Sequence, residues 1–185
     1  MRTRVRWLRW AFPLLIALLV GAFAWDYEVQ KNFSVVVPGK IYRSGQPREA
    51  QLEAWIQKYG LNSILSLRHG LPPYERELAE RYGVKIHNVT FSAGSGLKEG
   101  QWEAVLPILT DESNLPILIH CRGGGDRSGI VTALYRVEVQ GWPLDKAIRE
   151  MKHHYHVPLR YPALQKHLRE KFREDPEGGF APQTE

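Results

Sequence analysis

One stretch near the middle of the chain combines a cysteine, three glycines and an arginine in an order that suits chemistry on a tetrahedral oxyanion. It reads Ile119-His120-Cys121-Arg122-Gly123-Gly124-Gly125-Asp126-Arg127-Ser128-Gly129. An apolar run, 115–119, precedes it, and a helical pattern follows it. Successive backbone N–H groups of a glycine-rich loop converge on an anion, and the N-terminus of the following helix adds positive potential. We refer to residues 121–127 as the glycine loop.

Two side chains of the glycine loop would carry out the chemistry. The field that binds an anion also favours a thiolate at Cys121, the only cysteine of the chain, and makes it a candidate nucleophile at neutral pH. Arg127 offers a planar guanidinium that can hold two oxygens of the oxyanion at once, which a lysine cannot do. The alternative is a structural cysteine beside a tight turn, since free cysteines are often buried. Three successive glycines followed by Asp-Arg-Ser make a poor core and favour the functional interpretation.

This spacing resembles the signature of cysteine-dependent phosphatases of the protein-tyrosine and dual-specificity superfamily. His120-Cys121, five intervening residues and then Arg127-Ser128-Gly129 stand in the same order as in that signature. Upstream, residues 41–47, IYRSGQP, are similar to the first strand of the small bacterial, plant and fungal dual-specificity-like members. The resemblance covers residues 37 to about 172 and leaves out the N-terminal segment.

The resemblance implies hydrolysis of a phosphate monoester through a cysteinyl-phosphate intermediate, with neither a cofactor nor a metal. Cys121 would attack phosphorus, and His120 would help to hold the loop and favour the thiolate. Ser128 would donate a hydrogen bond to the sulfur when it leaves. The residues implied in phosphate binding are Arg122, Gly123, Gly124, Gly125, Asp126 and Arg127.

The general acid is the point at which the chain departs from the family. Family members carry an aspartate on a mobile loop before the catalytic strand, but residues 90–98 contain no carboxylate here. Asp126 and Glu99 are the candidates for this role, and the third alternative is an enzyme restricted to substrates with good leaving groups. Asp126 could instead cap the following helix or orient Arg127, because aspartate is a favoured N-cap residue.

Several functional alternatives remain open at this stage. A phosphate-binding pseudophosphatase would explain the missing acid, and a rhodanese-like sulfurtransferase also uses a cysteine in an anion-binding loop. Arg122 either contacts a second anionic group of the substrate or is a solvated charge. The substrate is expected to be a phosphoprotein, or a phosphoinositide or inositol phosphate. A structural turn is the favoured interpretation of Arg43, Ser44 and Gln46, with a position at the pocket rim as the alternative.

The charge of the chain is concentrated at its N-terminus. Residues 1–24 contain four arginines and no acidic residue, and the remainder has 21 basic against 20 acidic side chains. No basic stripe interleaved with aromatic residues occurs in that remainder, so we expect no nucleic-acid partner. The absence of CxxC and HExxH patterns gives no reason to expect a metal.

An apolar stretch, Trp10–Trp25, follows these arginines. It is shorter than the roughly 20 residues of a comfortable membrane span, and Ala22-Phe23-Ala24 fits a signal-peptidase site. We therefore expect residues 1–25 to be a cleaved export signal or an uncleaved membrane anchor. Both place the arginines in the cytoplasm and the rest of the chain outside it, in the periplasm if the source is a Gram-negative bacterium.

The rest of the chain is predicted to be a single-domain α/β structure with a mostly parallel sheet flanked by helices. Residues 26–40 are expected to be a linker, 41–173 the phosphatase-like domain and 174–185 a flexible tail. Because ligands of such sheets bind beyond the carboxyl ends of the strands, Cys121 falls at the expected position. The expected strands are 41–43, 63–67, 84–89 and 116–120, and the expected helices are 48–59, 74–82, 100–110, 127–140, 143–153 and 161–172.

Overall fold

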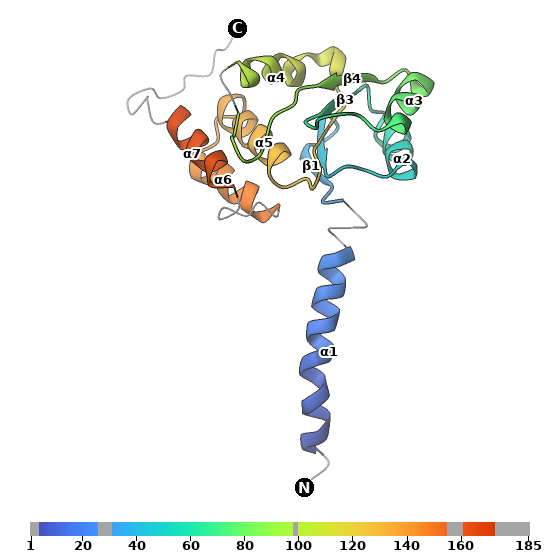
Figure 1. Ribbon diagram of the computed structural model, residues 1–185, viewed down its shortest axis with the longest axis vertical. Helices are drawn as coiled ribbons and strands as arrows, with labels where there is room; N and C mark the ends of the chain where they lie inside the picture. Colours follow the sequence, from blue (N-terminus) through green and yellow to red (C-terminus); the bar gives the residue numbers. More distant parts are fainter. Residues whose placement is uncertain (1–3, 26–30, 98–99, 155–160, 173–185) are drawn as a thin grey trace.

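The computed structural model describes residues 4–25, 31–97, 100–154 and 161–172, which form an α/β domain preceded by a helix (Figure 1). The strands are β1 (Ser34–Val37), β2 (Ile41–Ser44), β3 (Ser63–Ser66), β4 (Lys85–Asn88) and β5 (Ile117–His120). The helices are α1 (Arg4–Ala24), α2 (Glu49–Tyr59), α3 (Pro73–Tyr82), α4 (Gln101–Thr110), the short 3-10 helix η2 (Glu112–Asn114), α5 (Arg127–Glu138), α6 (Leu144–His153) and α7 (Pro162–Lys171).

The described strands form one sheet in the order β1-β2-β5-β3-β4. β2, β5, β3 and β4 run parallel, and β1 pairs antiparallel with β2 at one edge, which confirms the mostly parallel sheet. β5 lies at the centre, where its residues Ile117, Leu118 and Ile119 are fully buried, as is typical of a parallel strand covered on both faces. β3 is also buried along its whole length, because it lies between β5 and β4.

Helices cover both faces of the sheet and enclose two apolar clusters. Ile117 and Ile119 point into the larger cluster with Ile130 and Leu134 of α5, on the face that α4 to α7 cover. Leu118 points the other way, into a second cluster with residues of α2 and α3. Figure 1 shows these two layers on either side of the strands. Because successive side chains of β5 point to opposite faces, both helix layers pack against the strand that ends at Cys121.

The expectation of a linker over residues 26–40 is wrong for its second half. Ser34–Val37 forms β1, and Val36 is buried. Phe33 stacks on the rings of Tyr42 and Tyr59, with ring centroids 5.9 and 5.2 Å away. Three successive valines favour an extended strand, and the aromatic contacts hold that strand against the domain. The domain therefore begins before residue 41.

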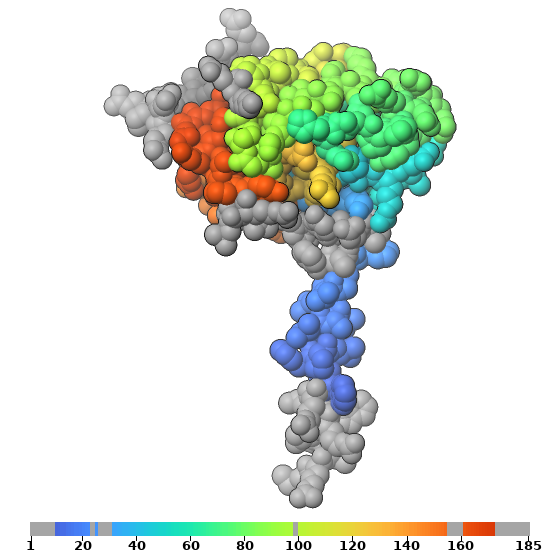
Figure 2. Space-filling model, in the orientation of Figure 1, coloured from blue at the N-terminus to red at the C-terminus, as the bar shows by residue number. Residues whose placement is uncertain are grey.

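Helix α1 extends away from the domain rather than docking on it (Figures 1 and 2). Its described side chains from Trp10 to Ala22 are exposed, although most of them are apolar. In the described ranges, no helix combines the length and the apolar character that a membrane crossing requires. The predicted tail, 174–185, lies outside the described residues.

Candidate active site

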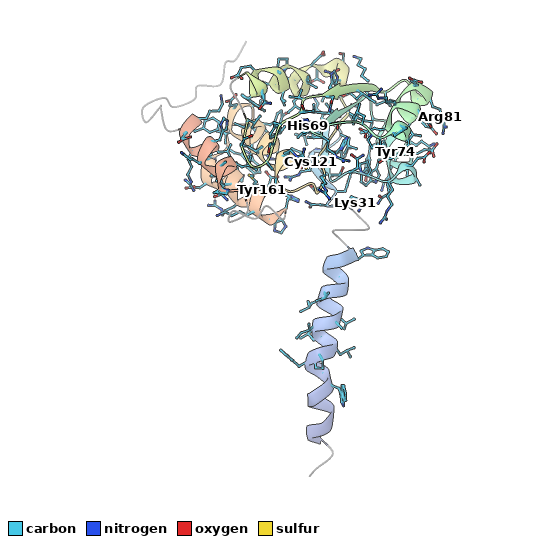
Figure 3. All side chains as sticks on the ribbon, in the orientation of Figure 1. Lys31, His69, Tyr74, Arg81, Cys121 and Tyr161 are labelled. Atoms are coloured by element: carbon cyan, nitrogen blue, oxygen red, sulfur yellow. The ribbon has the colours of Figure 1, made fainter. Side chains whose placement is uncertain are left out.

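The glycine loop joins the end of the central strand to the start of a buried helix. β5 ends at His120 and α5 begins at Arg127, so Cys121 lies at the carboxyl edge of the sheet, close to the centre of the domain (Figure 3). The cysteine side chain is 2% exposed. Its sulfur accepts a hydrogen bond from the backbone N–H of Gly124 at 3.2 Å and lies 3.5 Å from the hydroxyl oxygen of Ser128. The N–H of Gly124 aimed at the sulfur stabilises a thiolate, while the Ser128 hydroxyl donates to the carbonyl of Gly124 at 2.7 Å.

Close backbone contact shapes the loop at Gly124. This residue has φ +75°, and a Cβ on it would lie 2.5 Å from the backbone nitrogen of Gly45 and 2.8 Å from the carbonyl carbon of Ser44. The two segments are also joined by hydrogen bonds from the N–H of Cys121 to the Ser44 carbonyl and from the N–H of Gln46 to the carbonyl of Arg122, the next residue of the loop. Only glycine fits at position 124, which explains part of the glycine run.

The structure places the predicted phosphate-binding side chains around this loop. Arg127 donates from Nη1 to the carbonyl of Leu67 at 2.8 Å, which fastens the guanidinium to the end of β3. Asp126 stands at the N-cap position of α5, but its side chain makes no capping hydrogen bond. Arg122 is exposed at the rim. Glu99, the other candidate acid, lies outside the described residues.

Arg43 lies beneath the loop and is fully buried. Its Nη2 donates to the carbonyls of Gly124 and Gly125 at 2.5 and 3.4 Å. Burial lowers the pKa of Arg43 to about 10. A structural turn was the favoured interpretation of this segment, and the contact of Arg43 with the loop was not predicted. The available signal was the spacing of Arg43 from Ile41. Side chains two residues apart lie on the same face of a strand, so Arg43 lies on the same face of β2 as the buried Ile41.

A buried pair behind Cys121 was also missed. Nε2 of His120 lies 2.7 Å from Oε1 of Glu75 on α3, and neither side chain is exposed. Burial raises the pKa of Glu75, but the hydrogen bond and charge of His120, together with the Gln46 hydrogen bond and the charge of Arg68, outweigh burial and hold this pKa below its usual value. Because the carboxylate therefore accepts, Nε2 of His120 carries the proton. The available signal was the spacing of Glu75 from Leu78 and Ala79, which places the three on one buried helix face.

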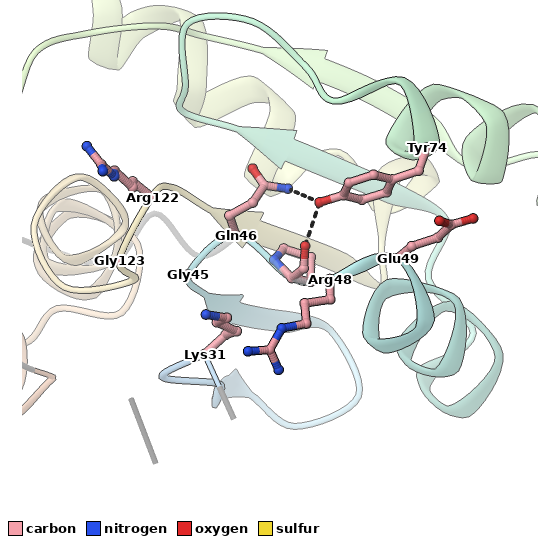
Figure 4. A pocket seen from close by; sticks show the side chains of 9 residues that line it. Lys31, Gly45, Gln46, Arg48, Glu49, Tyr74, Arg122 and Gly123 are labelled. Carbon is pink, nitrogen blue, oxygen red and sulfur yellow. Dashed lines mark hydrogen bonds between the residues drawn. The ribbon is translucent and has the colours of Figure 1, made fainter. Parts of the chain in front are cut away.

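A pocket of about 660 Å³ opens beside the loop (Figure 4). Arg122 and Gly123 of the loop line one part of it, and Lys31 and Arg48 line another. Gln46 lies between them and donates to the hydroxyl of Tyr74 at 3.0 Å and to Glu75 at 3.1 Å. The pocket lining holds three basic side chains against one acidic side chain, Glu49, and this positive excess favours an anionic occupant. Among the described residues, no group of three His, Cys, Asp or Glu side chains could hold a metal ion.

Comparison with known proteins places this arrangement among phosphatases. The sequence profile of the tyrosine phosphatase family matches residues 29–176. The chain is 26% identical over 170 residues to the dual specificity protein phosphatase TpbA of Pseudomonas aeruginosa, with 82% of this chain and 74% of the relative covered. It is 32% identical over 127 residues to the inositol diphosphatase SIW14 of Saccharomyces cerevisiae, with 66% of this chain and 44% of the relative covered. The solved catalytic core of Siw14 aligns with a TM-score of 0.68 at 26% identity, over 78% of this chain and 90% of that one.

Proposed function

The chain belongs to the tyrosine phosphatase family and is a cysteine-dependent phosphatase, and from this premise we propose which of its residues perform the reaction. The comparisons favour neither a phosphate-binding pseudophosphatase nor a rhodanese-like sulfurtransferase. The observation that carries the assignment is the position of the Cys121 sulfur. It lies at the end of the central strand with the N–H of Gly124 and the hydroxyl of Ser128 beside it.

The proposed reaction has two displacements at phosphorus. In the first, the Cys121 thiolate attacks in line, the bond from phosphorus to the leaving oxygen breaks, and an acid protonates that oxygen. The loop amides and Arg127 hold the three equatorial oxygens throughout. In the second, water attacks phosphorus and gives a proton to the carboxylate left by the acid, the sulfur–phosphorus bond breaks, and the hydroxyl of Ser128 donates to the departing thiolate. The products are the dephosphorylated alcohol or phenol and inorganic phosphate.

Replacing the nucleophile separates binding from turnover. We expect Cys121→Ser to abolish hydrolysis of p-nitrophenyl phosphate and to retain vanadate binding, because the loop amides and Arg127 stay in place. Steady-state kinetics and vanadate titration of the purified variant measure the two properties. Substantial residual turnover in this variant would exclude the covalent mechanism.

Asp126 is our proposed general acid. It lies in the glycine loop directly before Arg127, and residues 90–98, where the family carries its aspartate, contain no carboxylate. General acid catalysis contributes about 10² to 10⁴ in rate, most when the leaving oxygen is a poor leaving group.

We therefore expect Asp126→Asn to slow hydrolysis of an alkyl phosphate by about 10² or more while p-nitrophenyl phosphate is affected far less. The measurement is kcat for both substrates in wild type and variant. Glu99→Gln is the matched control, since it removes the competing carboxylate. Equal losses on both substrates in Asp126→Asn would refute the acid role.

We propose that the pocket beside the loop receives a second anionic group of the substrate, which favours inositol phosphates over singly phosphorylated substrates. Lys31, Arg48 and Arg122 line this pocket next to the loop. The relative SIW14 is named an inositol diphosphatase, which supports the same substrate class.

The ratio of kcat/KM for inositol hexakisphosphate to that for p-nitrophenyl phosphate tests this proposal. Loss of one charge-assisted contact in Arg48→Ala should lower the ratio about tenfold. Arg76→Ala is the control, because Arg76 is an exposed arginine that does not line the pocket. A ratio unchanged by Arg48→Ala would contradict the proposed substrate class.

We also propose that the N-terminal segment directs the domain out of the cytoplasm, as a cleaved signal or as an anchor. Its four arginines precede an apolar stretch whose described side chains are exposed on α1. A reporter fused after Glu185 tests the orientation, because positive charge stays on the cytoplasmic side. We expect an alkaline phosphatase fusion to be active. An inactive fusion together with fluorescence of a cytoplasmic reporter at the same position would show the opposite location.

A further inference from the structure

The space beneath the glycine loop is built around Arg43. This residue pairs in register with Ile119 of β5, two residues before Cys121. Gly129, in the first turn of α5, keeps the space open. A Cβ at that position would lie 2.9 Å from Cγ of Met151 and 3.5 Å from Nη2 of Arg43. The helix that follows the loop therefore approaches β2 closely while leaving room for a guanidinium.

Arg43 holds the direction of two peptide groups in the loop, one of them, that of Gly124, together with the Ser128 hydroxyl, which donates to the same carbonyl at 2.7 Å. Nη2 donates to the carbonyl of Gly124, with a longer contact to that of Gly125. In a planar trans peptide, the N–H of the next residue points opposite to the carbonyl. The N–H groups of Gly125 and Asp126 consequently point away from Arg43, toward the side on which the loop would bind an anion.

Burying this guanidinium is costly for the fold. Within the described part of the chain, its Nε and Nη1 have no hydrogen-bond partner. Burial lowers the pKa of Arg43, while the charge of Cys121, and then that of Glu150, acts in the opposite direction. Arg136 opposes the charge of Arg43, but it is bound to Glu150 by two hydrogen bonds of 2.8 and 2.9 Å. A buried charge that is only partly paired destabilises a protein, so its presence here calls for a function.

We propose that Arg43 is a positioning residue that acts on the reaction from beneath the loop. It turns the carbonyls of Gly124 and Gly125 downward, so that the following N–H groups face the phosphate, and it stabilises the thiolate of Cys121 through its charge. This inference rests on the proposed role of Cys121 as the nucleophile. Arg127 would hold the substrate oxygens, whereas Arg43 would not touch the substrate.

Two substitutions separate the charge of Arg43 from its geometry. Arg43→Met removes both, whereas Arg43→Lys keeps a positive charge without the planar fork of the guanidinium. Alkylation by iodoacetamide as a function of pH reports the thiolate at Cys121 alone, because the chain has no other cysteine. Vanadate affinity reports the orientation of the loop amides. Neither readout needs turnover.

In Arg43→Met we expect the midpoint of the alkylation profile to rise by about one pH unit and vanadate to bind about tenfold more weakly. In Arg43→Lys the midpoint should stay within about 0.3 pH unit of wild type, while vanadate binding weakens as in the methionine variant. Arg81→Met, at an exposed arginine bonded to Glu53, is the control and should match wild type in both measurements.

A folded Arg43→Met protein with the wild-type midpoint and wild-type vanadate affinity would overturn the proposal. Thermal unfolding curves establish whether each variant is folded. If Arg43→Met does not fold, Arg43→Lys decides, since unchanged vanadate affinity in that variant also overturns the proposal. The proposed function is tested separately by Cys121→Ser, so that a failure of the Arg43 role leaves the nucleophile in place.

Discussion

The position of the Cys121 sulfur depends on how closely two backbone segments approach each other. Gly45 and Gly124 meet with no room for a Cβ on Gly124, and a Cβ on Gly45 would lie 3.1 Å from the Arg122 carbonyl oxygen. This contact bends the loop back, so that the N–H of Gly124 reaches the sulfur. A side chain at position 124 would separate the segments and move the donor. The chemistry of the site therefore depends on the absence of a Cβ where the backbones at Gly45 and Gly124 approach each other.

The parallel sheet makes this approach possible, because it brings the ends of neighbouring strands to one edge. β2 ends beside the loop and delivers Arg43 beneath it, while the carbonyl of Leu67, just past the end of β3, holds Arg127. The third contribution comes from α3, whose Glu75 holds His120 from behind. Each of these groups comes from a separate element, yet all of them converge on the residues around one strand end. Rigid elements can hold such groups more accurately than loops can.

The sequence predicted those features of the fold and of the site that depend on residues close together along the chain. The order of residues from His120 to Gly129 and the alternation of strands with helices were enough for the loop, the sheet class and the phosphatase family. The roles of Arg43 and Glu75 depend on contacts across 81 and 45 residues, which no local pattern reports. β1 was missed for a related reason. The polar residues around its valines and the following Pro-Gly pair indicated a linker. The packing of Phe33 against Tyr42 and Trp55 explains why the strand joins the sheet.

The distance in sequence between Arg43 and Gly124 also has a consequence for how the chain acquires activity. During synthesis Arg43 emerges long before Gly124. Closing so long a loop carries an entropic cost that only the finished sheet offsets. The glycine loop by itself has too few apolar side chains to settle into its bent form early. Its bent form therefore depends on contacts that the folded sheet supplies, and under the proposed function an oxyanion bound there would shift the folding equilibrium toward the native state by mass action. Under the proposed function, phosphate binding and folding of the loop would be thermodynamically linked.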